Sequence, residues 1–141
     1  MRMEKEFLVR RPQAEAVAVV KQDETLEGLF PDTETEIVES KANRKTTRSR
    51  YRALGREGVA TFHFTFRPDG EVGFEKVCDG RVWRKLEGRM CFEETAKGTR
   101  VRIEMEGQTK TLVPEFTIRG PMQDQIEQMA KALKRRIEAK A

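Results

Sequence analysis

Long apolar runs are the first feature that the sequence lacks. No stretch of the 141 residues approaches the ~20 consecutive apolar residues that a membrane-crossing helix needs. The first six residues carry several charges and contain no apolar run of the kind found in signal peptides. These two absences predict a cytoplasmic protein that does not insert into a membrane.

Histidine and cysteine are scarce, which limits metal and redox chemistry. His63 is the single histidine, and Cys78 and Cys91 are too far apart in the sequence to form a CxxC pair. No recognisable zinc-binding set is present, so no metal site is expected and both thiols are expected to be free. His63 lies between Phe62 and Phe64, and strand alternation therefore predicts a surface histidine that points away from the apolar side.

Catalytic and phosphate-binding patterns are also missing. The sequence contains no glycine-rich loop of the P-loop or Rossmann type. Carboxylate pairs such as Glu93-Glu94 fall on predicted strands, where charge pairing explains them without acid–base catalysis. The cysteines lack a histidine partner in the pattern that would make either a nucleophile. No cofactor and no catalytic residue are therefore predicted, and an enzymatic role stays open only as an alternative.

Charged residues are abundant, and although the net charge is only +4, two adjacent segments carry opposite charge. Residues 22–39 carry acidic side chains and no basic ones, whereas residues 41–56 carry basic side chains and no acidic ones. A hairpin through a three-residue loop at 41–43 would pair the two blocks. The alternative is a phosphate- or RNA-binding face on the arginine-rich strand 44–52. The pairs expected from the hairpin are Glu34 with Arg50, Glu36 with Arg48 and Glu39 with Lys45.

Alternating aromatic residues predict a second hairpin. Residues 59–67 and 71–78 flank Pro68-Asp69-Gly70, a strong turn signal in which the glycine supplies a positive φ. A three-residue loop puts all the aromatic side chains on one face, so pattern and turn agree. The expected pairs are Phe66 with Val72, Phe64 with Phe74 and Phe62 with Lys76.

Turn residues divide the rest of the chain. Residues 2–10 are expected to form the first strand, and residues 14–20 and 26–30 two short helical segments after Pro12 and before Pro31. Turns are expected at Asp79-Gly80 and Lys97-Gly98, with a β-bulge at Gly88. The second turn predicts the pairs Phe92 with Ile103, Met90 with Met105, Glu93 with Arg102 and Arg89 with Glu106.

The C-terminal segment carries an apolar stripe with helical spacing. Gly120-Pro121 is the expected start of a helix of about 19 residues, with an outer face of Gln, Lys and Arg and with basic last turns. One long helix lying on one curved antiparallel sheet leaves space for a cavity between the two layers. The stripe consists of Met122, Ile126, Met129, Leu133 and Ile137.

This order of elements resembles the START-like (SRPBCC) superfamily, which includes polyketide aromatase/cyclases, lipid-transfer domains and carbon-monoxide-dehydrogenase G-type proteins. The residues that carry the resemblance are the Arg11-Pro12 entry, the segment 26–31, and the strand 101–105 that leads through Pro114 to the last helix. The resemblance spans nearly the whole chain as one domain, 1–141. It implies an α+β helix-grip fold: about seven antiparallel strands wrapped on the C-terminal helix, with two short helices between the first two strands.

The resemblance also implies a cavity between sheet and helix, with aromatic and methionine side chains suited to an adaptable apolar ligand. The alternative is that these side chains fill one another as an ordinary core. Thr47, Ser49 and Tyr51 share a strand face that would add polar groups. Lys76 would reach the rim, stack on Trp83 or bind a ligand carboxylate. The expected lining residues are Tyr51, Phe62, Phe64, Phe66, Phe74, Lys76, Trp83, Met90, Phe92, Ile103, Met105, Met122, Ile126, Met129 and Leu133.

Three functional hypotheses follow. The first is binding or transport of a hydrophobic or amphipathic small molecule, lipid-like or polyketide-like, by a monomer or homodimer. The second is a cyclase or hydrolase that uses Tyr51, Lys76 or a glutamate of the same cavity as acid or base. The third is an interaction module that binds RNA, a ribosome or an acidic protein through strand 44–52 and the basic last turns of the helix.

Overall fold

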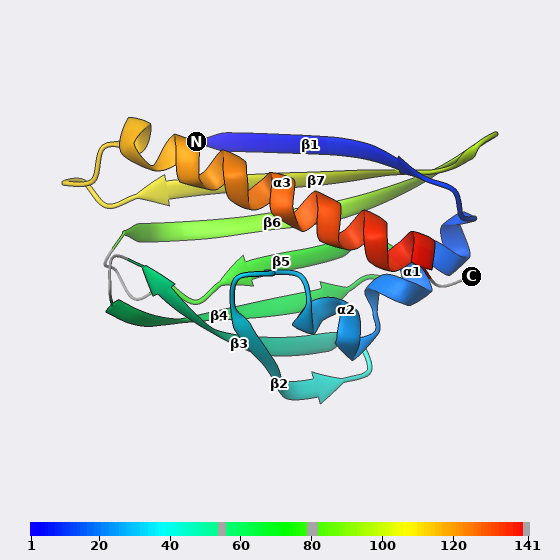
Figure 1. Ribbon diagram of the computed structural model, residues 1–141, viewed down its shortest axis with the longest axis horizontal. Coiled ribbons are helices and arrows are strands. Elements are labelled where there is room, and N and C mark those ends of the chain that lie inside the picture. The colour runs from blue at the N-terminus through cyan, green and yellow to red at the C-terminus, as the bar shows by residue number, and fades with distance from the viewer. Residues whose placement is uncertain (54–55, 79–81, 140–141) are drawn as a thin grey trace.

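The computed structural model describes residues 1–53, 56–78 and 82–139. It shows one seven-stranded antiparallel sheet in the order β1-β7-β6-β5-β4-β3-β2 (Figure 1), which confirms the predicted α+β helix-grip architecture. None of the helices in these ranges has the apolar length needed to cross a bilayer. The strands are β1 (Arg2–Val9), β2 (Glu34–Lys41), β3 (Arg44–Ala53), β4 (Arg56–Phe66), β5 (Val72–Lys76), β6 (Trp83–Thr95) and β7 (Gly98–Thr109), and the helices are α1 (Gln13–Val20), α2 (Asp23–Glu27) and α3 (Glu115–Ala139).

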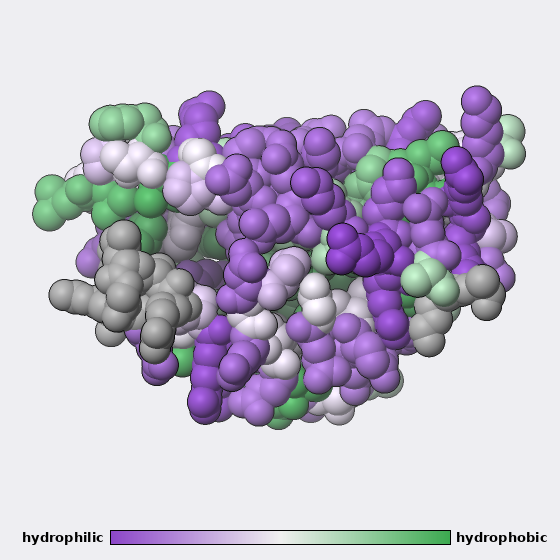
Figure 2. Space-filling model, in the orientation of Figure 1, coloured by the Kyte–Doolittle hydropathy of each residue, from purple (hydrophilic) through white to green (hydrophobic). Residues whose placement is uncertain are grey.

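Helix α3 lies over one side of the sheet rather than over its middle. It packs against β1 and β7 and meets α1 near its C-terminal end, as Figure 1 shows. Helix α2 and the segment that follows it cover the same face of the sheet toward its β2 edge. Between these two covers the surface is hollowed below the first half of α3 (Figure 2). The offset of the helix therefore determines where the space in the fold is found.

The predicted β4–β5 hairpin is confirmed. Phe66 pairs with Val72, Phe64 with Phe74 and Phe62 with Lys76. Gly70 has φ +93°, the positive value that the turn was expected to require.

The predicted register of β6 and β7 is wrong by two residues. The two-residue turn lies one residue earlier than expected, at 96–97 instead of 97–98, because Thr95 pairs with Gly98. Phe92 therefore faces Val101 instead of Ile103. A shift of two leaves every side chain on the same face, so the apolar sides still meet. The charged partners change, however. Met90 pairs with Ile103, Arg89 with Glu104 and Glu93 with Arg100.

The predicted bulge at Gly88 is also wrong. Gly88 pairs regularly with Met105 and Phe74, and the irregularity in β6 lies between Trp83 and Lys85. Gly88 serves the packing instead, since a Cβ there would collide with the Phe74 ring and with the Glu104 carbonyl oxygen. The expected turn at Asp79-Gly80 lies outside the described residues.

The charged hairpin is confirmed in part. Glu34 pairs with Arg50 and Glu36 with Arg48, but a register shift between Ile37 and Glu39 places Glu39 opposite Thr46, not Lys45. The strands continue to the pair Lys41 and Arg44, which leaves a two-residue turn in place of the expected three. The Lys45 ammonium instead lies 2.6 Å from an Asp23 carboxylate oxygen and joins β3 to α2.

Helix α3 begins at Glu115, six residues before Pro121. The prediction used Gly120-Pro121 as the start because proline favours the first turn of a helix. Pro114 occupies that place instead: the Thr117 amide donates to the Pro114 carbonyl oxygen at 3.1 Å. Pro121 lies within the helix, where its missing amide costs one backbone hydrogen bond.

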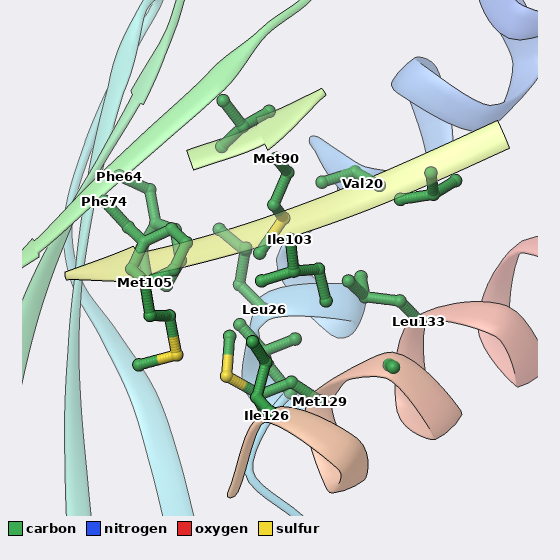
Figure 3. Close-up of a cluster of buried hydrophobic side chains, with 14 of the residues drawn as sticks. Val20, Leu26, Phe64, Phe74, Met90, Ile103, Met105, Ile126, Met129 and Leu133 are labelled. Atoms are coloured by element: carbon green, nitrogen blue, oxygen red, sulfur yellow. The ribbon is translucent and has the colours of Figure 1, made fainter. Parts of the chain in front are cut away.

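The core fills the space beneath the apolar stripe of α3, on the β1 and β7 side of the helix. Phe64, Met90, Ile103, Ile126 and Met129 are each 0% exposed. Figure 3 shows these side chains converging from the sheet and from α3, with Val20 and Leu26 of α1 and α2 beside them. The layer between the sheet and the apolar stripe of α3 is therefore solidly packed, and we call it the packed half of the interior.

Candidate functional site

A cavity of about 420 Å³ lies between the sheet, the first half of α3 and the segment after α2. This volume falls within the ~300–1,000 Å³ typical of small-molecule pockets. Every layer of the fold supplies part of its wall. The wall is formed by residues 29–33, by Ser49 and Tyr51 of β3, Ala60 and Phe62 of β4, Lys76 of β5, Trp83 and Leu86 of β6, and Pro121, Asp124, Gln125 and Gln128 of α3.

The apolar part of the wall is held rigidly. Phe30 stacks on Phe62 with ring centroids 5.2 Å apart, which fixes the covering segment on β4. Trp83 is 7% exposed and lies over Gly107, where a side chain would collide with the indole ring. These rings and Leu86 present a preformed apolar surface to the cavity.

Hydroxyl groups hold the covering segment to β3. The Thr33 hydroxyl donates to the Phe30 carbonyl oxygen at 2.7 Å and lies 3.0 Å from the Thr35 hydroxyl, which lies 2.7 Å from the Ser49 hydroxyl. This chain closes one edge of the cavity with polar groups that already have partners. Tyr51 lies across Gly58 at the same edge, 38% exposed.

Lys76 is the cationic group of the wall. Its side chain is half-buried on β5, opposite the Phe62 ring. Within the described ranges its ammonium group has no carboxylate partner. An ammonium group beside an apolar cavity suits an anionic head group, such as a carboxylate.

The structure separates the predicted lining residues into two groups. Tyr51, Phe62, Lys76 and Trp83 line the cavity. The others lie in the packed core or, for Phe92, half-buried against it. This second group consists of Phe64, Phe66, Phe74, Met90, Phe92, Ile103, Met105, Met122, Ile126, Met129 and Leu133.

Several lining residues were not predicted. The segment 29–33 was interpreted only as the end of a helical pair, although its Leu29, Phe30 and Pro31 are apolar enough to have suggested a wall. Gln125 and Gln128 lie beside the apolar stripe of α3 and were assigned to its outer face. They line the cavity because the helix is displaced toward β1 and β7.

A separate cluster of charges lies on the outer face of the sheet, around a depression of about 590 Å³. Glu104 is 8% exposed there and pairs with Arg89, with Arg2 at 3.2 Å and with Arg102 at 3.3 Å. The hydrogen bond from Arg89, more than any other interaction, lowers the pKa of the Glu104 carboxyl group, while burial opposes the shift. The cluster fixes the register of β1, β6 and β7.

Replacing Glu104 with glutamine is expected to make the free energy of unfolding depend less on pH between neutral and acidic solution. Because the folded pKa of Glu104 is lowered, its carboxylate stabilises the wild type at neutral pH, and this contribution disappears as pH falls through the folded pKa. The free energy of unfolding of wild type and variant, from urea titrations, should differ at neutral pH and converge as pH falls through the lowered folded pKa of Glu104. Glu106→Gln, an exposed position on the same strand, is the control. A difference that persists in acid would contradict the assignment.

His63 and Cys91 lie on this outer side. The His63 Nδ1 is 2.8 Å from the Thr46 hydroxyl, on the surface that alternation predicted for it. Burial raises the pKa of the Cys91 thiol, which disfavours the reactive thiolate. Among the residues that the structure describes, no group of three or more His, Cys, Asp or Glu side chains is placed to hold a metal ion.

Comparison with known proteins identifies the fold. No protein-family model and no curated protein sequence matches the chain. Solved structures do match. The protein TTHA0849 from Thermus thermophilus has a TM-score of 0.80 at 19% identity, covering 99% of this chain and 98% of its own. Zhui aromatase/cyclase from Streptomyces sp. R1128 has a TM-score of 0.77 at 13% identity, and the match covers 99% of this chain and 92% of that protein. A START superfamily protein from Mycobacterium smegmatis has a TM-score of 0.77 at 17% identity, and the match covers 99% of both chains. The resemblance to the START-like fold is therefore confirmed.

Proposed function

We propose that the protein binds a hydrophobic or amphipathic small molecule in the cavity beside the first half of α3. The observation that carries this proposal is the division of the interior: one half is a packed core, and the other half is an open space walled by aromatic and aliphatic side chains. A fold that only needed stability would gain by filling this space, since voids cost dispersion contacts. The START superfamily and aromatase/cyclase relatives support a ligand of this class.

The wall also indicates how such a ligand lies. Phe30, Phe62, Trp83 and Leu86 accept its apolar body, and Lys76 faces an anionic or polar end. Ser49 and Tyr51 add hydroxyl groups at the β3 edge. An amphipathic carboxylate or phenolate satisfies both parts of the wall, because the apolar surface is buried and the ammonium group gains a partner.

Trp83 provides a direct test because it is the single tryptophan and lines the cavity. We expect 1-anilinonaphthalene-8-sulfonate to bind saturably to the folded protein and to quench Trp83 fluorescence. Ala60→Leu points a larger side chain into the cavity and should weaken binding by about tenfold or more without loss of stability. Val59→Leu is the matched control, since Val59 is adjacent in β4 but 55% exposed.

Absence of saturable binding, or equal binding by wild type and Ala60→Leu, would contradict the proposal. Native mass spectrometry of the purified protein adds the chemical class of any retained ligand. Incubation of that ligand with the protein then separates a carrier from a cyclase, because a carrier returns the ligand with its mass and structure unchanged.

A further inference from the structure

Three apolar side chains are exposed together at the end of the molecule where α3 begins. Leu112 is 93% exposed, Phe116 79% and Val82 36%. We call Val82, Leu112 and Phe116 the apolar tip. Figure 2 shows apolar side chains gathered at this end of the surface, next to the hollow below α3.

The apolar tip is built on an ordered turn. The Lys110 amide donates to the Val82 carbonyl oxygen at 2.9 Å, which holds the start of β6 against the end of β7. The Val113 amide donates to the Lys110 carbonyl oxygen at 2.9 Å, and the Thr109 hydroxyl to the Val113 carbonyl oxygen at 2.8 Å. Leu112 thus projects from a closed turn, and its exposure is a property of the fold.

The surroundings of the apolar tip are positive. Arg84, Lys110 and Arg119 are all exposed, and the Arg84 guanidinium donates to the Thr111 hydroxyl at 3.3 Å, beside Leu112. Glu115, the acidic residue that precedes Phe116, is paired with the N-terminal ammonium group at 3.4 Å. Protruding apolar side chains ringed by basic ones match the two layers of an anionic bilayer surface, with its charged head groups and the acyl chains below.

The apolar tip borders the cavity. Trp83, which lines the cavity, follows Val82 directly and pairs with Thr109. Pro121, also in the cavity wall, lies little more than one helical turn beyond Phe116. A surface that holds the tip would therefore lie next to one end of the cavity.

We propose that the apolar tip docks the protein on an anionic lipid membrane, with Leu112 and Phe116 entering the interfacial layer and Arg84, Lys110 and Arg119 contacting lipid phosphates. This peripheral docking goes beyond ligand binding in the cavity and does not require it. A second copy of the chain fits less well: a two-fold contact would bring the two sets of basic side chains together around only three apolar residues on each copy.

The test is co-sedimentation of the intact protein with vesicles, in the absence of any cavity ligand. Wild type should bind vesicles of phosphatidylcholine and phosphatidylglycerol, bind pure phosphatidylcholine much less, and dissociate as salt is raised. Leu112→Ser/Phe116→Ser should partition at least about tenfold less. Leu8→Ser/Val59→Ser, which removes exposed apolar side chains elsewhere, should bind as the wild type does.

Two results would overturn the proposal. One is failure of the wild type to bind anionic vesicles, or equal loss in both double variants. The other is a wild-type dimer, measured by sedimentation without vesicles, that Leu112→Ser/Phe116→Ser abolishes, because the tip would then be a contact between copies. The anilinonaphthalene assay on the same variants keeps the two proposals apart: the tip variant should retain probe binding, and vesicle binding without probe binding would remove only the proposed ligand function.

Discussion

Replacing Phe64 with alanine is expected to lower the free energy of unfolding by about 3 to 5 kcal/mol, the range for a fully packed phenylalanine. Phe64 is 0% exposed, and its ring lies between those of Phe62 and Phe74, with centroids 6.3 and 6.0 Å away. The cavity left by the truncation cannot collapse easily, because β4 is paired on both sides. Guanidinium unfolding followed by circular dichroism measures the change.

Phe116→Ala is the matched control for this loss. It removes the same atoms from a side chain that is 79% exposed, so the expected change is within about 0.5 kcal/mol. A phenylalanine that faced the ligand cavity would fall between the two values, since it lacks neighbours on one side. A cost for Phe64→Ala near that of the control would mean that the packed half of the interior is not packed.

The parts of the fold that could be predicted are those where two local signals agree. In the β4–β5 hairpin, the turn Pro68-Asp69-Gly70 and the alternation of aromatic residues each select the same register. The apolar stripe of α3 likewise follows from its spacing alone, and Met122, Ile126, Met129 and Leu133 are all buried. Local patterns of this kind do not depend on the rest of the molecule.

The β6–β7 register could not be predicted because strand periodicity is two. A shift by two residues keeps apolar side chains opposite apolar ones and opposite charges together, so both registers satisfy the pattern. What distinguishes them is a tertiary contact: Gly98 has φ +139°, and a Cβ there would collide with the Val9 carbonyl oxygen of β1. The sequence around Gly98 does not predict that β1 will lie next to this turn.

The boundary between cavity and core could not be predicted from the sequence either. Inward-facing apolar side chains are required both to line a pocket and to fill a core, so alternation assigned Phe62 and Phe64 to the same wall. The two differ because α3 lies toward β1 and β7 and the segment 29–33 covers the other side. Placement of one layer over another depends on contacts between distant residues, which a single-sequence pattern does not contain.

Met129→Trp and Gln125→Trp, four residues apart on α3, are expected to have opposite outcomes. Met129 is 0% exposed in the packed half, so an indole has no space there and should cost about 3 kcal/mol or more, with loss of cooperative unfolding. Met129→Leu, nearly equal in volume, should cost less than about 1.5 kcal/mol. Thermal unfolding and solubility distinguish the two Met129 variants.

Gln125 lines the cavity and is only partly buried, so its replacement by tryptophan should be tolerated, with the ring occupying the open space. The Gln125→Trp variant should unfold cooperatively near the wild-type temperature and should no longer bind 1-anilinonaphthalene-8-sulfonate, because the indole takes the place of the ligand. The reverse pattern, a native-like Met129→Trp that blocks the probe and an unfolded Gln125→Trp, would place the space on the β1 and β7 side of α3 and the core on the β3–β6 side. Loss of probe binding in Gln125→Trp with full retention of fold therefore locates the binding site on the β3–β6 side of the helix.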